Sequence, residues 1–357
     1  MRSRILIVAP PVGPLGSGEA GGVETHLLNL SPILAARGHE IAIIAPAGSA
    51  APAADVKLYP VAGEMSASAT RAARAARTVV NTRGVLENMW DQAQRLQSHY
   101  DIVIGMSYDW LPFYLTPWFT TPLAHWITIG SAIDEVDGII ERRWREGGLR
   151  LAMYTGTQGR TYPFLQSERV HLLYGGVDTA VFKYQAQPCN RLCWAGRISR
   201  EKGLEDAIAV ARALHMPLDV CGKVQDEAYW QALIQDAGEH VVYHGFLPPA
   251  ELQKRYGDAR AALVTPHWIE AFGNTVIESL ACGTPVVAYD RGGPAEIVEQ
   301  GRSGILVPYE SSVAGLIAGV REAVKLDRRM AAARAMEFSF DQMADRFEAW
   351  VRSITEG

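Results

Sequence analysis

The stretch RILIVAPPVGPLGSGEAGGVETHLLNLSPILAARGHEIAIIA, residues 4–45, decides the fold. Residues 4–9 form a continuous apolar run, which is typical of a strand buried on both faces of a sheet. A loop rich in glycine and proline follows, and aliphatic residues then recur at helical spacing from Val23 to Leu34. A second buried strand is predicted at residues 39–45, where residues 41–45 are apolar. This order of strand, loop, helix and strand is a βαβ unit, and it predicts an α/β domain with a parallel sheet.

The same alternation continues along the chain. In the first half we expect a helix over residues 68–98, strands at 101–105 and 122–129, and helix and loop over 131–165. After a polar linker at residues 183–190 the alternation restarts. Strands are predicted there at residues 192–195, 217–221, 241–244, 261–265, 285–288 and 304–307, with helices between them. We therefore expect two doubly wound domains, 1–183 and 184–338, followed by an amphipathic helix over 339–357.

The composition excludes several classes of protein. The 357 residues carry a net charge of −5, so no basic excess points to nucleic acid. The four cysteines are scattered without the spacing of a zinc site. No apolar run approaches the roughly 18 residues of a membrane span, and we expect a cytoplasmic protein. Arginines at 71, 74, 77 and 83, with those at 142, 143 and 145, form either a basic patch for peripheral membrane contact or ordinary solvated faces.

The stretch EAFGNTVIESLACG, residues 270–283, carries the most specific chemistry. Its helix is expected to start near Asn274 and to bury the face of Val276, Ile277 and Leu280. The free backbone N–H groups at residues 273–275 suit an anion such as phosphate. Ionised Glu270 and Glu278 only accept hydrogen bonds and therefore suit hydroxyl groups. Phosphate with hydroxyls describes a nucleotide sugar, although a solvated loop carboxylate and an ordinary helix carboxylate remain the alternative.

Two other loops, one in each expected domain, follow strands and are expected to face the same cleft. Arg197 and Lys202 lie in the loop after residue 195, where two cations would neutralise a diphosphate unless the loop is simply polar surface. Gly21 and Gly22 precede the first helix, in a loop that matches neither GxGxxG nor GxxxxGK[ST]. Glycines at a helix start allow close approach of a ligand to the backbone.

These motifs together resemble glycosyltransferase family 4, which has the GT-B fold. The resemblance rests on Glu270-Ala-Phe-Gly273 followed by Glu278, on Gly283-Thr-Pro285, on Gly196-Arg197 with Lys202-Gly203, and on Gly292-Gly293-Pro294. It covers most of residues 190–308 and, less fully, residues 21–40. It implies two Rossmann-like domains facing a central cleft, with the acceptor held by the first domain and the donor by the second. The last helix would cross back to the first domain.

The resemblance also implies roles for residues. Arg197 and Lys202 would bind the donor pyrophosphate, Glu278 the ribose, and Glu270 the transferred sugar, and Arg197, Lys202 and Glu270 form the predicted catalytic set. The remaining predicted donor-binding residues are Gly21, Gly22, Gly196, Gly222, Lys223, Leu247, Ala271, Phe272, Gly273, Asn274 and Thr275. The family retains anomeric configuration. No DxD triplet is present to hold a metal ion against the diphosphate, so neither a metal nor a cofactor is expected.

The sequence departs from the family at two positions. Thr128 stands where the family commonly has a histidine near the donor sugar, and Gly175 stands where it often has asparagine. His26, His125 and Thr128 are therefore the candidates near sugar or acceptor, with His125 alternatively a structural residue. A UDP-sugar is favoured over a GDP-sugar, and the acceptor is a hydroxyl of a small molecule, glycan or lipid-linked compound. A catalytically silent nucleotide-sugar binding or scaffold protein is the alternative, whereas the missing GxGxxG argues against a dehydrogenase.

Overall fold

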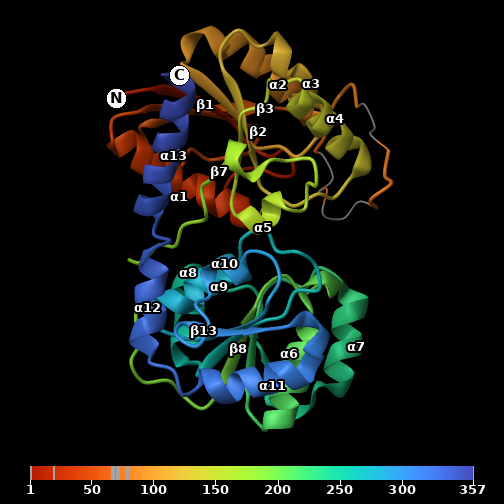
Figure 1. The fold of residues 1–357 in the computed structure, drawn as a ribbon, viewed down its shortest axis with the longest axis vertical. Helices are drawn as coiled ribbons and strands as arrows, with labels where there is room; N and C mark the ends of the chain where they lie inside the picture. Colours follow the sequence, from red (N-terminus) through yellow and green to blue (C-terminus); the bar gives the residue numbers. More distant parts are fainter. Residues whose placement is uncertain (1, 19–20, 66–68, 70–72, 78–80, 357) are drawn as a thin grey trace. The chain divides into compact units, whose positions relative to one another are not determined.

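The computed structural model describes residues 2–18, 21–65, 69, 73–77 and 81–356. The chain divides into two units, residues 1–174 with 340–357 (unit 1) and residues 175–339 (unit 2). Figure 1 shows that each unit is built around its own sheet with helices packed on it. In the part of the chain that is described, no helix is long and apolar enough to cross a lipid bilayer.

Unit 1 contains a seven-stranded parallel sheet in the order β3-β2-β1-β4-β5-β6-β7. Its strands are β1 (Arg4–Val8), β2 (Glu40–Pro46), β3 (Val56–Val61), β4 (Ile102–Gly105), β5 (Leu123–Ile127), β6 (Leu151–Met153) and β7 (Val170–Leu172). Its helices are α1 (Gly22–Ala36), α2 (Val85–Leu96), α3 (Trp110–Leu115), α4 (Asp134–Arg145), α5 (Gly156–Gly159) and α13 (Phe340–Thr355). α13 packs against α1 within this unit.

Unit 2 contains a six-stranded parallel sheet in the order β10-β9-β8-β11-β12-β13. Its strands are β8 (Leu192–Ala195), β9 (Leu218–Cys221), β10 (Val241–Tyr243), β11 (Ala261–Val264), β12 (Val286–Tyr289) and β13 (Gly304–Val307). Its helices are α6 (Leu204–Leu214), α7 (Glu227–Ala237), α8 (Pro249–Asp258), α9 (Asn274–Ala281), α10 (Pro294–Ile297), α11 (Ser312–Ala323) and α12 (Arg328–Met336). α6 packs on α11, whereas α9 packs on α8 and α12, so helices cover both faces of the sheet (Figure 1).

The order of strands in unit 2 places a topological switch point between β8 and β11. These two strands are neighbours, but the chain continues from β8 toward β9 on one side and from β11 toward β12 on the other. Ligands of open parallel sheets bind beyond the carboxyl ends of the strands at such a point. The loops that follow β8 and β11 carry Arg197, Lys202 and Glu270, so these three residues lie where a ligand of the sheet would bind.

Two expectations for unit 1 are wrong. Residues 73–77 and 81–84 are not helical, so the helix predicted over 68–98 shortens to α2. Strands β3, β6 and β7 were not predicted at all. β3 contains Lys57 and Pro60 and lies at the edge of the sheet, and β6 and β7 have three residues each.

The arginine patch proposed from the sequence is largely paired with carboxylates. Arg74 forms ion pairs with Asp134 and Asp137. On α4, the last-turn arginines Arg142, Arg143 and Arg145 pair with Glu146, Glu146 and Glu141 respectively. Arg71 lies outside the described residues. The described arginines are thus solvated or paired groups of a mixed surface.

Candidate active site

Two hydrogen bonds, one between backbone groups and one from a side chain, join the loop after β8 to the loop after β11. The N–H of His267 donates to the carbonyl of Glu201 at 2.9 Å, and the Thr265 hydroxyl donates to the carbonyl of Gly203 at 2.6 Å. Gly203 has φ 63°, and a Cβ at that position would lie 2.0 Å from the Thr265 carbonyl oxygen. Only glycine fits this turn, which carries Lys202 directly before it.

Lys202 and Glu270, which are 68 residues apart in sequence, form an ion pair at the switch point. The ammonium Nζ of Lys202 lies 2.7 Å from Oε2 and 3.0 Å from Oε1 of Glu270. Trp268 donates its indole N–H to Oε2 at 2.9 Å, and its ring centroid is 4.8 Å from the same ammonium. The two paired side chains are only 17% and 18% exposed. The sequence pointed to both charges separately, but neither their pairing nor Trp268 was predicted.

The charge state of Glu270 results from opposing effects. Burial alone would raise the pKa of its carboxyl group, but the attraction and hydrogen bonds of Lys202, the bond from Trp268 and the charge of Arg197 together lower the pKa below its ordinary value. Glu270 is therefore an ionised hydrogen-bond acceptor at neutral pH. It is a poor proton donor, which argues against an acid/base role.

Arg197 lies at the edge of this site. Its guanidinium donates to Oε1 of Gln225 at 3.2 Å and lies 3.7 Å from Oε1 of Glu201, and its side chain is 37% exposed. The side chain is therefore half-buried and partly open to solvent. Its charge nevertheless acts on Glu270.

Close backbone packing positions the loop at residues 270–273. The N–H of Gly293 donates to the carbonyl of Glu270 at 2.7 Å. A Cβ on Gly292 would lie 2.4 Å from that carbonyl oxygen, and one on Gly293 would lie 1.9 Å from the carbonyl oxygen of Phe272. Gly292 and Gly293 thus allow the loop after β12 to press against the segment that carries Glu270.

Helix α9 begins directly after this loop. Gly273 is its N-cap with φ 117°, and Asn274 and Thr275 form its first turn. The first N–H groups of a helix have no intrahelical acceptor and carry the positive end of the helix dipole. As expected, Val276, Ile277 and Leu280 are buried. Ala271, Phe272 and Gly273 lead into this helix start, with Phe272 buried.

Glu278 faces a less polar environment than Glu270. Its Oε2 lies 3.5 Å from the hydroxyl of Tyr256 in α8, a long and weak contact. Burial raises the pKa of Glu278 to about 7, and the Tyr256 hydroxyl only partly opposes this. Near neutral pH this carboxyl group is therefore balanced between its two protonation states.

The loops after β8, β9 and β10 lie against one another. Gly222, with φ 146°, would place a Cβ 1.8 Å from the Gly196 carbonyl oxygen, and its N–H donates to the Gly245 carbonyl at 2.8 Å. Lys223 directly follows Gly222 and is exposed, and Leu247 lies two residues after Gly245 and is half-buried. The structure thus brings the predicted residues Gly196 and Gly222 into contact.

The predicted residues of unit 1 occupy a different setting. Gly21 is the N-cap of α1 with φ 62°, and Gly22 is the first residue of that helix. Glu24, which was not among the predicted site residues, is buried and accepts hydrogen bonds from the backbone N–H groups of Gly16 and Gly18 at 2.5 and 2.9 Å. Its carboxylate therefore shapes the glycine-rich loop from within the first turn of the helix.

His26, His125 and Thr128 are all buried. His26 Nδ1 lies 2.7 Å from the hydroxyl of Tyr154. His125 Nε2 lies 2.9 Å from the hydroxyl of Thr116, and burial lowers the pKa of His125 to about 3. His125 is consequently neutral, and its ring packs 4.5 Å from that of Phe113. These contacts favour the structural interpretation of His125, and the other two residues remain candidates.

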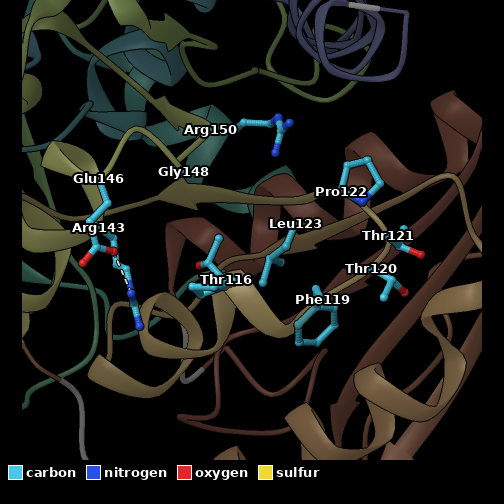
Figure 2. A pocket seen from close by; sticks show the side chains of 11 residues that line it. Thr116, Phe119, Thr120, Thr121, Pro122, Leu123, Arg143, Glu146, Gly148 and Arg150 are labelled. Carbon is cyan, nitrogen blue, oxygen red and sulfur yellow. Dashed lines mark hydrogen bonds and ion pairs between the residues drawn. The ribbon is translucent and has the colours of Figure 1, made fainter.

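A hollow of about 420 Å³ in unit 1 is lined by Thr116, the hydrogen-bond partner of His125, but by none of the residues of the Lys202–Glu270 site. Figure 2 shows the residues that line it, among them Leu123 at the start of β5, Pro122 just before it, Arg143 of α4 with its ion pair to Glu146, and Arg150, which precedes β6. It therefore opens at the amino-terminal edge of the sheet, opposite the edge where parallel sheets bind their ligands. None of its lining residues is a predicted site residue.

A known protein family matches the unit that holds the Lys202–Glu270 pair. Residues 179–337 match the model of glycosyl transferases group 1. These residues are a group 1 glycosyltransferase domain. The match confirms the resemblance found in the sequence, and it includes every element of the switch-point site described above.

Two curated relatives illustrate the similarity of sequence. The alpha-maltose-1-phosphate synthase of Mycolicibacterium smegmatis is 31% identical over 177 residues, which are 43% of this chain and 46% of that enzyme. A D-inositol 3-phosphate glycosyltransferase of Pseudarthrobacter chlorophenolicus is 27% identical over 345 residues, 83% of this chain and 80% of that enzyme. The match to the first of these thus spans about half of its length.

Two solved structures illustrate the similarity of fold. Sucrose-phosphate synthase from Thermosynechococcus elongatus has a TM-score of 0.78 at 17% identity, covering 99% of this chain and 100% of that one. Anabaena HepE in complex with UDP and glucose has a TM-score of 0.78 at 15% identity, with the same coverages. The chain therefore has the two Rossmann-like domains of the GT-B fold, as the sequence predicted.

Proposed function

We propose that this group 1 glycosyltransferase transfers a hexose from a nucleoside diphosphate sugar to an acceptor hydroxyl, with retention of anomeric configuration and without a metal ion. The observation that carries the proposal is the Lys202–Glu270 pair at the switch point, three residues before the N-cap of α9. A cation, an ionised hydrogen-bond acceptor and a helix N-terminus together suit a phosphate next to sugar hydroxyls.

The site offers distinct partners to the parts of such a donor. The ammonium of Lys202, the exposed guanidinium of Arg197 and the N–H groups of Asn274 and Thr275 would bind the diphosphate. Glu270 keeps further lone pairs while it is bonded to Lys202, so it would also accept hydrogen bonds from sugar hydroxyls. Glu278 would accept from the ribose, and ribose binding would favour its ionised form.

The nucleobase belongs, in this proposal, to the loops after β9 and β10, near Gly222, Lys223 and Leu247. We favour uracil because HepE, which shares the fold, has been solved with UDP and with UDP-glucose. A GDP-sugar is the second choice. The acceptor is a hydroxyl compound, and unit 1 is the proposed part of the protein that holds it. His26 and Thr128 remain the candidates near the sugar or acceptor, His125 is assigned a structural role, and Gly21 and Gly22 stay with the donor phosphates.

The chemical step follows from these roles. The bond between the anomeric carbon and the diphosphate oxygen breaks, and the acceptor oxygen bonds to the anomeric carbon on the same face. The acceptor proton passes to the departing phosphate oxygen. Lys202, Arg197 and the start of α9 stabilise the negative charge that develops on the leaving diphosphate, which is the principal contribution of the protein. With two cations present, this stabilisation requires no metal.

Transfer assays with a panel of donors test the proposal. The wild-type chain is incubated with UDP- and GDP-sugars and a mixed set of hydroxyl acceptors, with a chelator present and absent. We expect transfer from a single class of donor, unaffected by chelator, and its loss in Glu270→Ala and Lys202→Ala. Lys325→Ala and Glu322→Ala are matched controls, because these residues form an exposed pair at 2.7 Å elsewhere in unit 2.

Three outcomes would change the conclusion. Full transfer by Glu270→Ala and Lys202→Ala would refute the assignment of the site. Donor binding without transfer to any acceptor would favour a silent binding or scaffold protein. Loss of activity with chelator, restored by a divalent cation, would refute the metal-free reaction.

A further inference from the structure

A cluster of polar side chains joins the start of α6 to the ends of β11 and β12. One carboxylate oxygen, Oδ2 of Asp206, accepts the hydroxyl of Tyr289 at 2.6 Å and lies 2.9 Å from Nε2 of His267. The other ring nitrogen of His267 lies 3.8 Å from Oε1 of Glu205. The ring of Tyr309 covers the cluster, with its centroid 6.0 Å from that of His267 and 5.1 Å from that of Tyr289.

The donors and acceptors of this cluster are well defined. Burial, followed by the hydrogen bond to Asp206, raises the pKa of Tyr289, so its hydroxyl keeps the proton and donates it. An ionised carboxylate only accepts hydrogen bonds, so the proton of His267 facing Asp206 is on Nε2. Asp206 therefore holds two donors, from residues 61 and 83 positions later in the chain, on one oxygen.

His267 connects this cluster to the Lys202–Glu270 pair in two ways. Its backbone N–H donates to the carbonyl of Glu201, the residue before Lys202. It also directly precedes Trp268, whose indole donates to Glu270 and whose ring lies by the ammonium of Lys202. A shift of His267 would therefore move both members of the pair.

We propose that Asp206 and His267 are positioning residues of the donor site, although neither belongs to the motif that identified it. Asp206 anchors the His267 ring, and His267 in turn fixes the distance between Lys202 and Glu270. Their role in the reaction rests on the proposed function, whereas their effect on the geometry does not. Side chains that bind a reacting group must be held to within about 0.5 Å, and such support commonly comes from neighbours that do not touch the ligand.

Three variants separate this role from a general effect on folding. Asp206→Asn removes the charge and one acceptor position, and His267→Ala removes the donor to Asp206. His267→Gln keeps an N–H group at nearly the position of Nε2. It should therefore restore the hydrogen bond to Asp206 that His267→Ala removes. Asp327→Asn is the matched control, because Asp327 is a half-exposed carboxylate at the N-cap of α12 in the same unit.

The first readout needs no donor. The full chain is labelled with 5-fluorotryptophan, and the ¹⁹F resonance of Trp268 is assigned as the signal missing from Trp268→Phe. We expect this resonance to shift or broaden in Asp206→Asn and His267→Ala, and to stay at the wild-type position in His267→Gln and Asp327→Asn. An unchanged Trp268 resonance in Asp206→Asn and His267→Ala would overturn the proposal.

The second readout is steady-state transfer with the donor that the wild-type chain uses. We expect Asp206→Asn and His267→Ala to lower kcat about ten- to a hundredfold and also to raise KM for the donor, with recovery in His267→Gln. A variant that was merely partly unfolded would contain fewer active molecules, so its apparent kcat would fall while KM for the donor stayed unchanged. Equal losses in His267→Gln and His267→Ala would overturn the proposal. If the wild-type chain transfers no sugar, the proposed function fails, but the ¹⁹F result still decides the geometry.

Discussion

Replacement of Lys202 by methionine removes the ammonium from Glu270 while keeping an unbranched side chain. The ammonium lies 2.7 and 3.0 Å from the two carboxylate oxygens, and both side chains are more than four-fifths buried. The indole of Trp268 stays as a donor to Glu270, so the carboxylate is not left entirely without partners. We expect the free energy of unfolding to fall by about 1–3 kcal/mol, the cost of leaving a buried charged group partly unsatisfied.

The loss of stability caused by Lys202→Met should depend on pH in a defined direction. In the wild-type chain the pKa of Glu270 is lower when folded than when unfolded, so its contribution to stability is present above the unfolded pKa and disappears as pH falls through the folded pKa. In Lys202→Met, burial is no longer offset by the ammonium, and the folded pKa of Glu270 rises. Protonation then removes the buried charge in mildly acidic solution. The destabilisation should therefore be largest near neutral pH and should shrink on acidification.

Urea unfolding of the full chain at about pH 7.5 and about pH 4.5 measures both effects. A double-mutant cycle with Glu270→Gln isolates the interaction between the two side chains. Lys325→Met with Glu322→Gln is the control cycle, and its exposed pair should contribute less than about 0.5 kcal/mol. A coupling for Lys202 and Glu270 as small as that of the control pair, or a loss equal at the two pH values, would refute the reasoning.

Three further predictions concern single side chains. Gly293→Ala would force a Cβ to 1.9 Å from the Phe272 carbonyl oxygen, so its Tm should fall by several degrees, whereas Gly138→Ala, whose Cβ meets nothing within 4 Å, should leave Tm unchanged or raise it. Glu278 has a pKa of about 7 in the folded chain, above its unfolded value. Its ionisation therefore destabilises the fold as pH rises through 7. Glu278→Gln should reduce the loss of stability measured between about pH 6 and pH 8. His125 has a folded pKa of about 3, below its unfolded value. The free energy of unfolding should therefore decline as pH falls below about 6.5. His125→Gln should flatten that part of the acid-unfolding profile.

Most strands of unit 2 were predictable because they are buried on both faces, although β10 lies at the edge of the sheet with Val242 and Tyr243 exposed. Such strands read as short apolar runs, and helices with amphipathic spacing separate them. All six, from β8 to β13, lie where the sequence predicts them. In unit 1 the same logic found β1, β2, β4 and β5. It missed β3, an edge strand that contains lysine and proline, and it missed β6 and β7, which have three residues each.

The residue types of the candidate site could also be predicted from short segments of the sequence. A glutamate before a glycine that opens a helix, and two cations after a strand, are features of segments only a few residues long. The sequence also indicated that Val276, Ile277 and Leu280 form the buried face of α9, because helical spacing alone decides which side chains share a face.

What the sequence by itself determined is therefore the alternation of elements, the buried faces, and the chemistry available at each strand end. The tertiary structure decided which of these groups meet. Lys202 and Glu270 form a pair because β8 and β11 are neighbours in the sheet, and Asp206 reaches His267 and Tyr289 for the same reason. The pKa values of Glu278 and His125 depend on the burial supplied by other elements. Periodicity and capping are local properties of the chain, but the order of strands is a property of the whole sheet, and that order determines which loops come together.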